Sequence, residues 1–119
     1  MKLFEVTSPK MTPELIMYLA RLNVHDATLS PSGRVIVNGN VYFSSGETSI
    51  EFPFESVSGV FGCSNTSITS LEGAPQSVGG VFNCSSTKIT SLEGAPQSVG
   101  TGFYCNNTKI TSLKHAPQS

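Results

Sequence analysis

Three cysteines recur at one position of a repeated phrase, and their thiols are the most reactive groups that the sequence offers. Cys63, Cys84 and Cys105 stand at one constant spacing. A thiolate could act as a nucleophile, a metal ligand or half of a disulfide. The odd number disfavours a disulfide framework, no C-x-x-C pair is available for zinc, and no histidine occupies a repeated strand position as a base. We therefore predict a column of packed, unreactive thiols, with no metal and no cofactor.

The charged residues offer little further chemistry. Glu72 and Glu93 share one repeat position, where we expect solvated charges on the outer surface. His25 and Asp26 form the one adjacent histidine–acid pair, which we interpret as polar surface after a helix. No phosphate-binding loop, metal motif or catalytic triad is present. The sequence therefore predicts that the protein is not an enzyme.

Threonines recur in two further columns. The columns are Thr66, Thr87 and Thr108, and Thr69, Thr90 and Thr111. Stacked hydroxyl groups can hydrogen-bond along a coil and satisfy the backbone of its turns. An array of threonines is also compatible with ice binding, which we disfavour because an inward isoleucine separates the two columns.

All these residues belong to one 21-residue unit that is written three times. Aligned on its leucine, the unit reads V-x-x-x-F-x-C-x-x-x-x-I-x-x-L-x-x-A-P-x-x. A fixed period of this length predicts a solenoid. Phenylalanine and cysteine lie two positions apart and so point to the same side of an extended segment. We expect one parallel strand per unit, stacked about 4.8 Å from the next. The apolar side chains that recur in the unit are expected to form a dry core on the inward side.

The chain is predicted to divide into an N-terminal cap over residues 1–56 and three 21-residue repeats over residues 57–119, the last one incomplete. A helix is expected over about residues 12–22, because Thr12 suits the N-cap and Pro13 the first helical position. Its expected apolar face consists of Leu15, Ile16, Leu19 and Leu22. This face would cover the open end of the first turn.

Strands are expected over about residues 34–44, where apolar residues alternate in "VIVNGNVYF". Asn38 and Gly39 in this stretch are compatible with a hairpin turn or with a break inside a degenerate first turn. The Ala-Pro segment of each unit is expected to lead back to the next turn, and we call it the return leg. The next apolar stretch, "IEFPF", is interpreted as a degenerate return leg, with Pro53 in place of the proline of the repeat.

The unit resembles the leucine-rich repeat, because Phe82, Cys84, Ile89 and Leu92 fit the spacing of the last four apolar positions of that motif. Two features depart from it: Val78 comes one residue early, and a threonine replaces the usual asparagine. The short return leg is similar to the bacterial-effector type. The phrase "SLEGAP-x-x-VGG-x-F-x-C" resembles small leucine-rich-repeat proteins that are common in tailed-bacteriophage genomes. The resemblance implies an α+β, right-handed solenoid of parallel strands with a helical cap.

Composition narrows the class of partner. Seven Lys and Arg residues and a net charge of −1 do not support a nucleic-acid-binding surface. No run of about 18 apolar residues exists, so we expect no membrane span. The N-terminus is too polar for a signal peptide. We therefore predict a cytoplasmic protein, in the host cytoplasm if a phage encodes it.

We predict a protein–protein interaction module that binds a host or phage protein through the concave face of the solenoid. The candidate contacts flank the inward Phe and Cys positions and differ between units, as expected for a solenoid surface. These candidates are Ser64, Val81, Asn83, Ser85, Tyr104 and Asn106. Tyr104 is the one aromatic residue that we expect there, and aromatic residues often anchor interfaces. Drift on a solvent-exposed face remains the alternative interpretation.

A structural or assembly element is the competing class of function. The last unit has no predicted cap, and an exposed strand edge is a site where chains associate. Three explanations stay open at this point: a longer array, association with a second copy, or a partner at this end.

Overall fold

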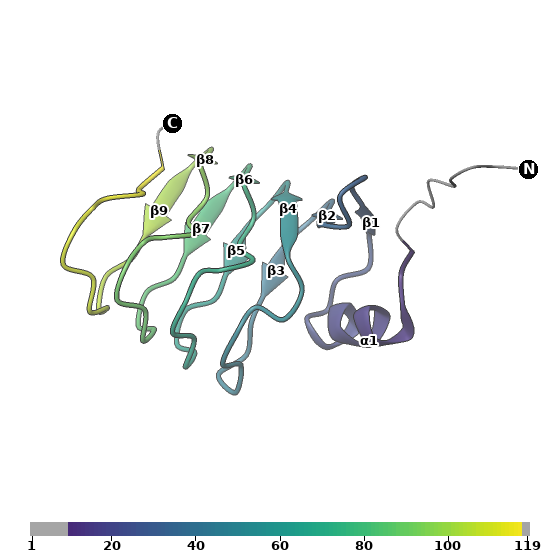
Figure 1. Ribbon diagram of the computed structural model, residues 1–119, viewed down its shortest axis with the longest axis horizontal. Coiled ribbons are helices and arrows are strands. Elements are labelled where there is room, and N and C mark those ends of the chain that lie inside the picture. Colours follow the sequence, from purple (N-terminus) through teal and green to yellow (C-terminus); the bar gives the residue numbers. More distant parts are fainter. Residues whose placement is uncertain (1–9, 118–119) are drawn as a thin grey trace, which may run out of the picture.

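Residues 10–117 wind into an elongated coil of about three turns, with a helix at the N-terminal end (Figure 1). This computed structural model describes residues 10–117. The first nine residues of the expected cap and the last two of the third repeat lie outside it. The elements are α1 (Pro13–Arg21), β1 (Ala27–Leu29), β2 (Val35–Val37), β3 (Val41–Tyr42), β4 (Phe54–Val57), β5 (Phe61–Gly62), β6 (Ser77–Val78), β7 (Val81–Asn83), β8 (Ser98–Val99) and β9 (Gly102–Tyr104).

Each repeat supplies two short strands, so the expectation of one strand per unit is wrong. The strands form two sheets, which we call sheet A (β1-β2-β4-β6-β8) and sheet B (β3-β5-β7-β9). The two strands of a turn are separated by a glycine corner. A side chain at Gly79 would overlap the carbonyl oxygen of Ser58, and one at Gly100 would overlap that of Gly79. These two positions have room only for glycine, because the preceding turn lies against the backbone there.

The repeats stack in parallel, with each residue above its equivalent in the next unit. Phe61 pairs with Phe82, and Phe82 pairs with Phe103. Their rings stack at centroid distances of 5.5 and 5.4 Å, with interplanar angles of 4° and 7°. Such stacking follows from the strand spacing of about 4.8 Å, which places like side chains above one another. A single apolar column therefore runs through the coil.

The cysteines lie in this core, as predicted. Cys63 and Cys84 are fully buried, and Cys105 in the last described turn is partly buried. The first threonine column closes the backbone turn after each cysteine. The hydroxyls of Thr66, Thr87 and Thr108 each donate a 2.8 Å hydrogen bond to the carbonyl three positions earlier. These threonines therefore satisfy turn backbone within their own unit, not along the coil.

A leading turn precedes the repeats. Strands β2 and β3 lie in different sheets and pair in parallel with β4 and β5. Asn38 and Gly39 therefore form a corner of this turn, not a hairpin. The expectation that Pro53 takes the place of the proline in the return leg is wrong. Because Ser56 pairs with Ser77, the buried Phe54 stands where the repeat has Pro75, and Pro53 comes one position too early.

The helix packs its apolar face on the leading turn. Thr12 is the N-cap and its hydroxyl accepts from the backbone N–H of Leu15 at 3.2 Å. The buried face contains Tyr18, with Leu15, Leu19 and Leu22, whereas Ile16 is 54% exposed. Including Ile16 in the buried face was therefore wrong, because positions i, i+3, i+4 and i+7 define the stripe. Within residues 10–117 no helix is long and apolar enough to cross a membrane.

Candidate functional site

The outward side of sheet B gathers the candidate contact residues. Strand register aligns them in columns along the coil. The central column is Tyr42, Gly62, Asn83 and Tyr104. The flanking columns are Asn40, Val60, Val81 and Gly102, and Ser44, Ser64, Ser85 and Asn106. None of these twelve positions carries a charge. We call this surface the sheet B face.

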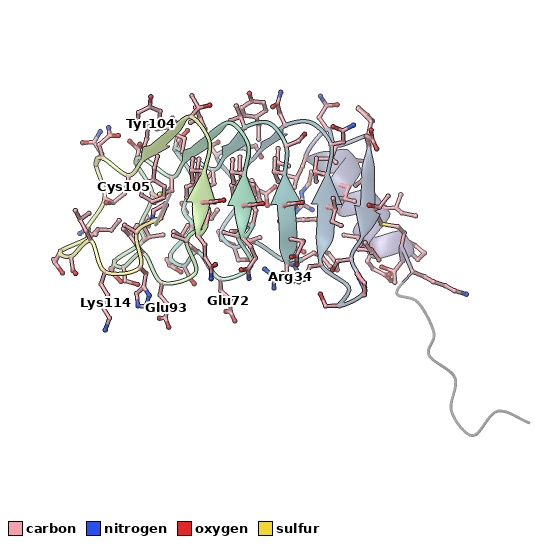
Figure 2. The ribbon with its side chains drawn as sticks, turned by 90° about the horizontal axis from the view of Figure 1, so that it is seen from above. Arg34, Glu72, Glu93, Tyr104, Cys105 and Lys114 are labelled. Atoms are coloured by element: carbon pink, nitrogen blue, oxygen red, sulfur yellow. The ribbon has the colours of Figure 1, made fainter. Side chains whose placement is uncertain are left out.

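The candidates differ in how far they reach solvent. Tyr104 is 51% exposed and Asn106 is exposed. Ser64, Val81 and Asn83 are half-buried, whereas Ser85 is only 8% exposed. Tyr104 projects on the side opposite to Glu72, Glu93 and Lys114 (Figure 2). The structure thus places all six residues on one sheet face but leaves Ser85 little contact surface.

Tyr42 is a residue of this face that the sequence analysis missed. It is 57% exposed and extends the central column by one turn, so Tyr104 is not the one aromatic residue there. The alternation of buried Val41 and Phe43 with Tyr42 would have identified it. It was overlooked because the leading turn is one position shorter than a repeat: Val41 pairs with Phe61, and Phe61 pairs with Phe82.

Both tyrosine rings lie over glycines. A side-chain carbon added to Gly62 would stand 3.1 Å from Cδ1 of Tyr42. One added to Gly102 would stand 3.2 Å from Oη and 3.3 Å from Cζ of Tyr104. One side of each ring therefore lies against glycine backbone, and about half of each tyrosine remains open to solvent. These rings are platforms on which a ligand can stack.

Intramolecular hydrogen bonds orient the amides of the face. Asn40 Oδ1 accepts from the backbone N–H of Val60 at 2.8 Å, and Asn83 Oδ1 accepts from that of Ser85 at 3.0 Å. Asn106 Oδ1 accepts from the hydroxyl of Ser85 at 2.6 Å. A backbone N–H can only donate, which fixes the oxygen of the first two amides. Ser85 thus orients two asparagines.

The thiols are poorly suited to chemistry. Burial raises the pKa of Cys63 to about 12. Burial also raises the pKa of Cys84 well above the ordinary thiol value, and its neighbours Cys63 and Cys105 add to the rise. Both thiols therefore stay protonated and unreactive at neutral pH. Within residues 10–117 no three His, Cys, Asp or Glu side chains converge closely enough to hold a metal ion.

A hollow and two exposed acids lie on the return-leg side of the coil. A hollow of about 640 Å³ lies over the Gly-Ala-Pro-Gln segments of two turns, with Arg34 and His115 among its lining residues. Arg34 binds the backbone: its Nε and Nη2 donate hydrogen bonds to the Phe54 carbonyl at 3.0 and 2.6 Å. Glu72 and Glu93 are exposed, as expected. This arrangement places no activated group beside the hollow.

An ion pair joins the helix to the leading turn. Arg21 donates to Glu47 through Nε at 3.0 Å and Nη2 at 3.1 Å, and to Glu51 at 2.9 Å. Glu47 is 7% exposed, and its guanidinium partner stacks over Tyr18 at 5.1 Å. These contacts raise the pKa of Arg21. The cluster fixes where the helix docks, and its groups are all paired.

No protein-family model, curated protein or solved structure matches this chain. The sheet B face is the part of the described surface where exposed aromatic rings and oriented amides occur together.

Proposed function

We propose that the protein is a protein-binding module and that the sheet B face contacts the partner. The observation that carries this proposal is a pair of half-exposed tyrosines, Tyr42 and Tyr104, on one uncharged sheet surface. Tyrosine is enriched among the residues that dominate binding energy at interfaces. The rings sit on a rigid scaffold, because the opposite side of each strand is locked into the core. A partner therefore meets a pre-ordered surface, which lowers the entropic cost of binding.

The lack of charge on this face sets how the partner is held. Binding through packing and neutral hydrogen bonds changes little with ionic strength, because screening acts on charges. We therefore expect affinity for the partner to be nearly constant between low and high salt. A steep loss of affinity with salt would point to another surface.

Site-directed photocrosslinking tests the proposal. A benzoylphenylalanine at Tyr104 is expected to crosslink a protein from an extract of the cells that make this chain. The matched control carries the same group at Ser77 in sheet A, where no such product is expected. Loss of the product in Tyr42→Ala would support the site. Equal crosslinking from Ser77 and Tyr104 would contradict it.

The fold type and source belong to the same proposal. We infer that the unit is a leucine-rich repeat of the short bacterial-effector type, in a phage-encoded cytoplasmic protein. Its support is the spacing of the apolar positions and the resemblance of the repeated phrase to that of small phage proteins. We also infer that α1 caps the coil, supported by the ring contact between Tyr18 and Phe52 at 5.1 Å. Deleting residues 1–24 is then expected to cause aggregation.

Self-association is a second candidate function. In the last described turn Leu113 is 73% exposed, whereas the equivalent Leu71 and Leu92 are fully buried. A second copy on this turn would cover Leu113 together with the open edges of β8 and β9. Sedimentation velocity over a range of protein concentrations tests the idea. A concentration-dependent dimer that dissociates in Leu113→Lys would support it, and a monomer at all concentrations would exclude it.

A further inference from the structure

The sheet B face presents a row of oriented hydrogen-bond donors. The amide oxygens of Asn40, Asn83 and Asn106 are each occupied by a bond within the molecule. Each Nδ2 group is left with two N–H donors for a ligand. The hydroxyl groups of Tyr42 and Tyr104 add donors at the two ends of the central column. A ligand rich in hydrogen-bond acceptors therefore complements these outward N–H donors.

The same face offers two stacking platforms and no charge. The ring of Tyr42 covers Gly62, and that of Tyr104 covers Gly102. These glycines lie two turns and two positions apart, which corresponds to roughly 12 Å at the spacings of a parallel sheet. A polyproline II helix rises about 3.1 Å per residue. Four or five residues of such a helix therefore reach from one ring to the other.

We propose that the partner presents a proline-rich segment in the polyproline II conformation, and that this segment lies across the sheet B face between Tyr42 and Tyr104. This inference rests on the proposed function and names the chemistry of the partner. Proline has no backbone N–H, and the polyproline II backbone makes no internal hydrogen bonds. Its carbonyl groups are thus free acceptors for the asparagine donors, while its rings stack on tyrosine.

Other ligand classes match the face less well. A nucleic acid would stack on the rings but would find no cation for its phosphates on these columns. Arg21, which lies beside Tyr42 and Asn40, is already paired with Glu47 and Glu51. A saccharide carries hydroxyl groups that donate as well as accept, so part of its hydrogen-bonding capacity would face donors. A flexible glycine-rich peptide supplies carbonyl groups, but it loses more entropy when ordered and brings backbone N–H donors.

Replacing an asparagine by aspartate tests the contribution of its side-chain N–H donor to binding. In Asn83→Asp the side-chain oxygen can still accept from the Ser85 N–H, while the outward donor becomes an acceptor. We expect about a five- to tenfold loss of affinity for acetylated, amidated decaproline, as for one lost hydrogen bond. Gln97→Glu is the matched control, because it makes the same chemical change at an exposed site outside the face. The Tyr42→Ala, Tyr104→Ala double variant is expected to lose about thirtyfold.

The direct readout is a titration of the protein with decaproline, followed by fluorescence anisotropy and by the side-chain amide signals in a nitrogen–proton correlation spectrum. We expect the Asn83 and Asn106 amide protons to shift downfield, with no shift for a glycine–serine decapeptide. Absence of decaproline binding at millimolar concentration, or equal affinities for Asn83→Asp and Gln97→Glu, would overturn the inference. So would a neutral oligosaccharide that shifts the same amides. A protein crosslinked at Tyr104 that decaproline does not displace would refute the proline-rich segment and leave the proposed function standing.

Discussion

The leading turn and the repeats place different residues at the same position of the coil. In the repeats this position holds Ile68 and Ile89, which are fully buried. In the leading turn it holds Glu47. The equivalence follows from the backbone, since Ser67 N–H donates to the Glu47 carbonyl and Lys88 N–H to that of Ile68. The neighbouring element therefore determines which residue fits this position: next to a further turn it is isoleucine, and next to the helix that carries Arg21 it is glutamate.

The largest expected effect comes from moving the glutamate into the repeats. Ile89→Glu buries a carboxylate among apolar side chains with no cation to pair with it. Such a charge destabilises a protein by about 3–5 kcal/mol, so we expect a chain that is largely unfolded by circular dichroism. Ile89→Val, the control, should cost only about 1 kcal/mol. A cooperatively folded Ile89→Glu protein of nearly unchanged stability would mean that the core is not dry.

Removing the cation from the leading turn should have the next largest effect. Arg21→Ala leaves Glu47 nearly buried without its bidentate partner. We expect a lower free energy of unfolding and the loss of helical signal before the sheet signal in a denaturant titration. The decrease in the free energy of unfolding should be smaller than that caused by Ile89→Glu, because Glu47 lies near the surface. Recovery in the Arg21→Met, Glu47→Leu double variant would confirm the pairing, and an unaffected Arg21→Ala protein would contradict it.

Alkaline pH probes the buried thiols of the repeats. The pKa of Cys63 is raised from an ordinary 9.0 to about 12 in the folded chain, so the thiol contribution to stability is present below the ordinary pKa and is lost as the pH rises above it. The expected slope is up to about 1.4 kcal/mol per pH unit for each buried thiol. Urea titrations at pH 8, 9 and 10 measure it. The Cys63→Ala, Cys84→Ala protein should have a flatter profile, and identical slopes would be inconsistent with burial.

The smallest effect on stability is expected on the sheet B face. Tyr104→Ser removes an aromatic ring whose residue is half exposed, and such surface changes usually alter the free energy of unfolding by less than about 0.5 kcal/mol. Tyr42→Ser should behave alike. A loss of more than about 2 kcal/mol would assign these rings to the scaffold instead of to an interface.

A strict period made the inward columns of the repeats predictable from the sequence. Cys63 and Cys84 could be placed in the core from spacing, because stacking demands like residues at like positions. Glycine at position 79 indicates a tight turn or a close backbone approach, and the structure has one there. That the backbone on both sides of this corner pairs as strands was not predicted. The buried position of Phe54 was not predicted. Phe54 is equivalent to Pro75 of the repeat, and because the leading turn has no proline at this position, comparison with the repeat did not reveal the equivalence.

The candidate site was predictable where it lies inside the repeats and not beyond them. Tyr104 and Asn83 follow from alternation with buried residues. Tyr42 was missed because the register changes by one position at the leading turn. The role of Ser85 was also hidden, because a hydrogen bond between Ser85 and Asn106 joins two different turns and leaves no local pattern in the sequence.

Thiol labelling tests the central claim, a dry spine of stacked turns, most directly. Alkylation by iodoacetamide near neutral pH, followed residue by residue with mass spectrometry, compares three equivalent cysteines in one experiment. We predict that Cys105, which is partly exposed, reacts first, and that Cys63 and Cys84 react only at the rate of unfolding. Labelling of Cys63 or Cys84 as fast as Cys105 in the folded protein would contradict the account.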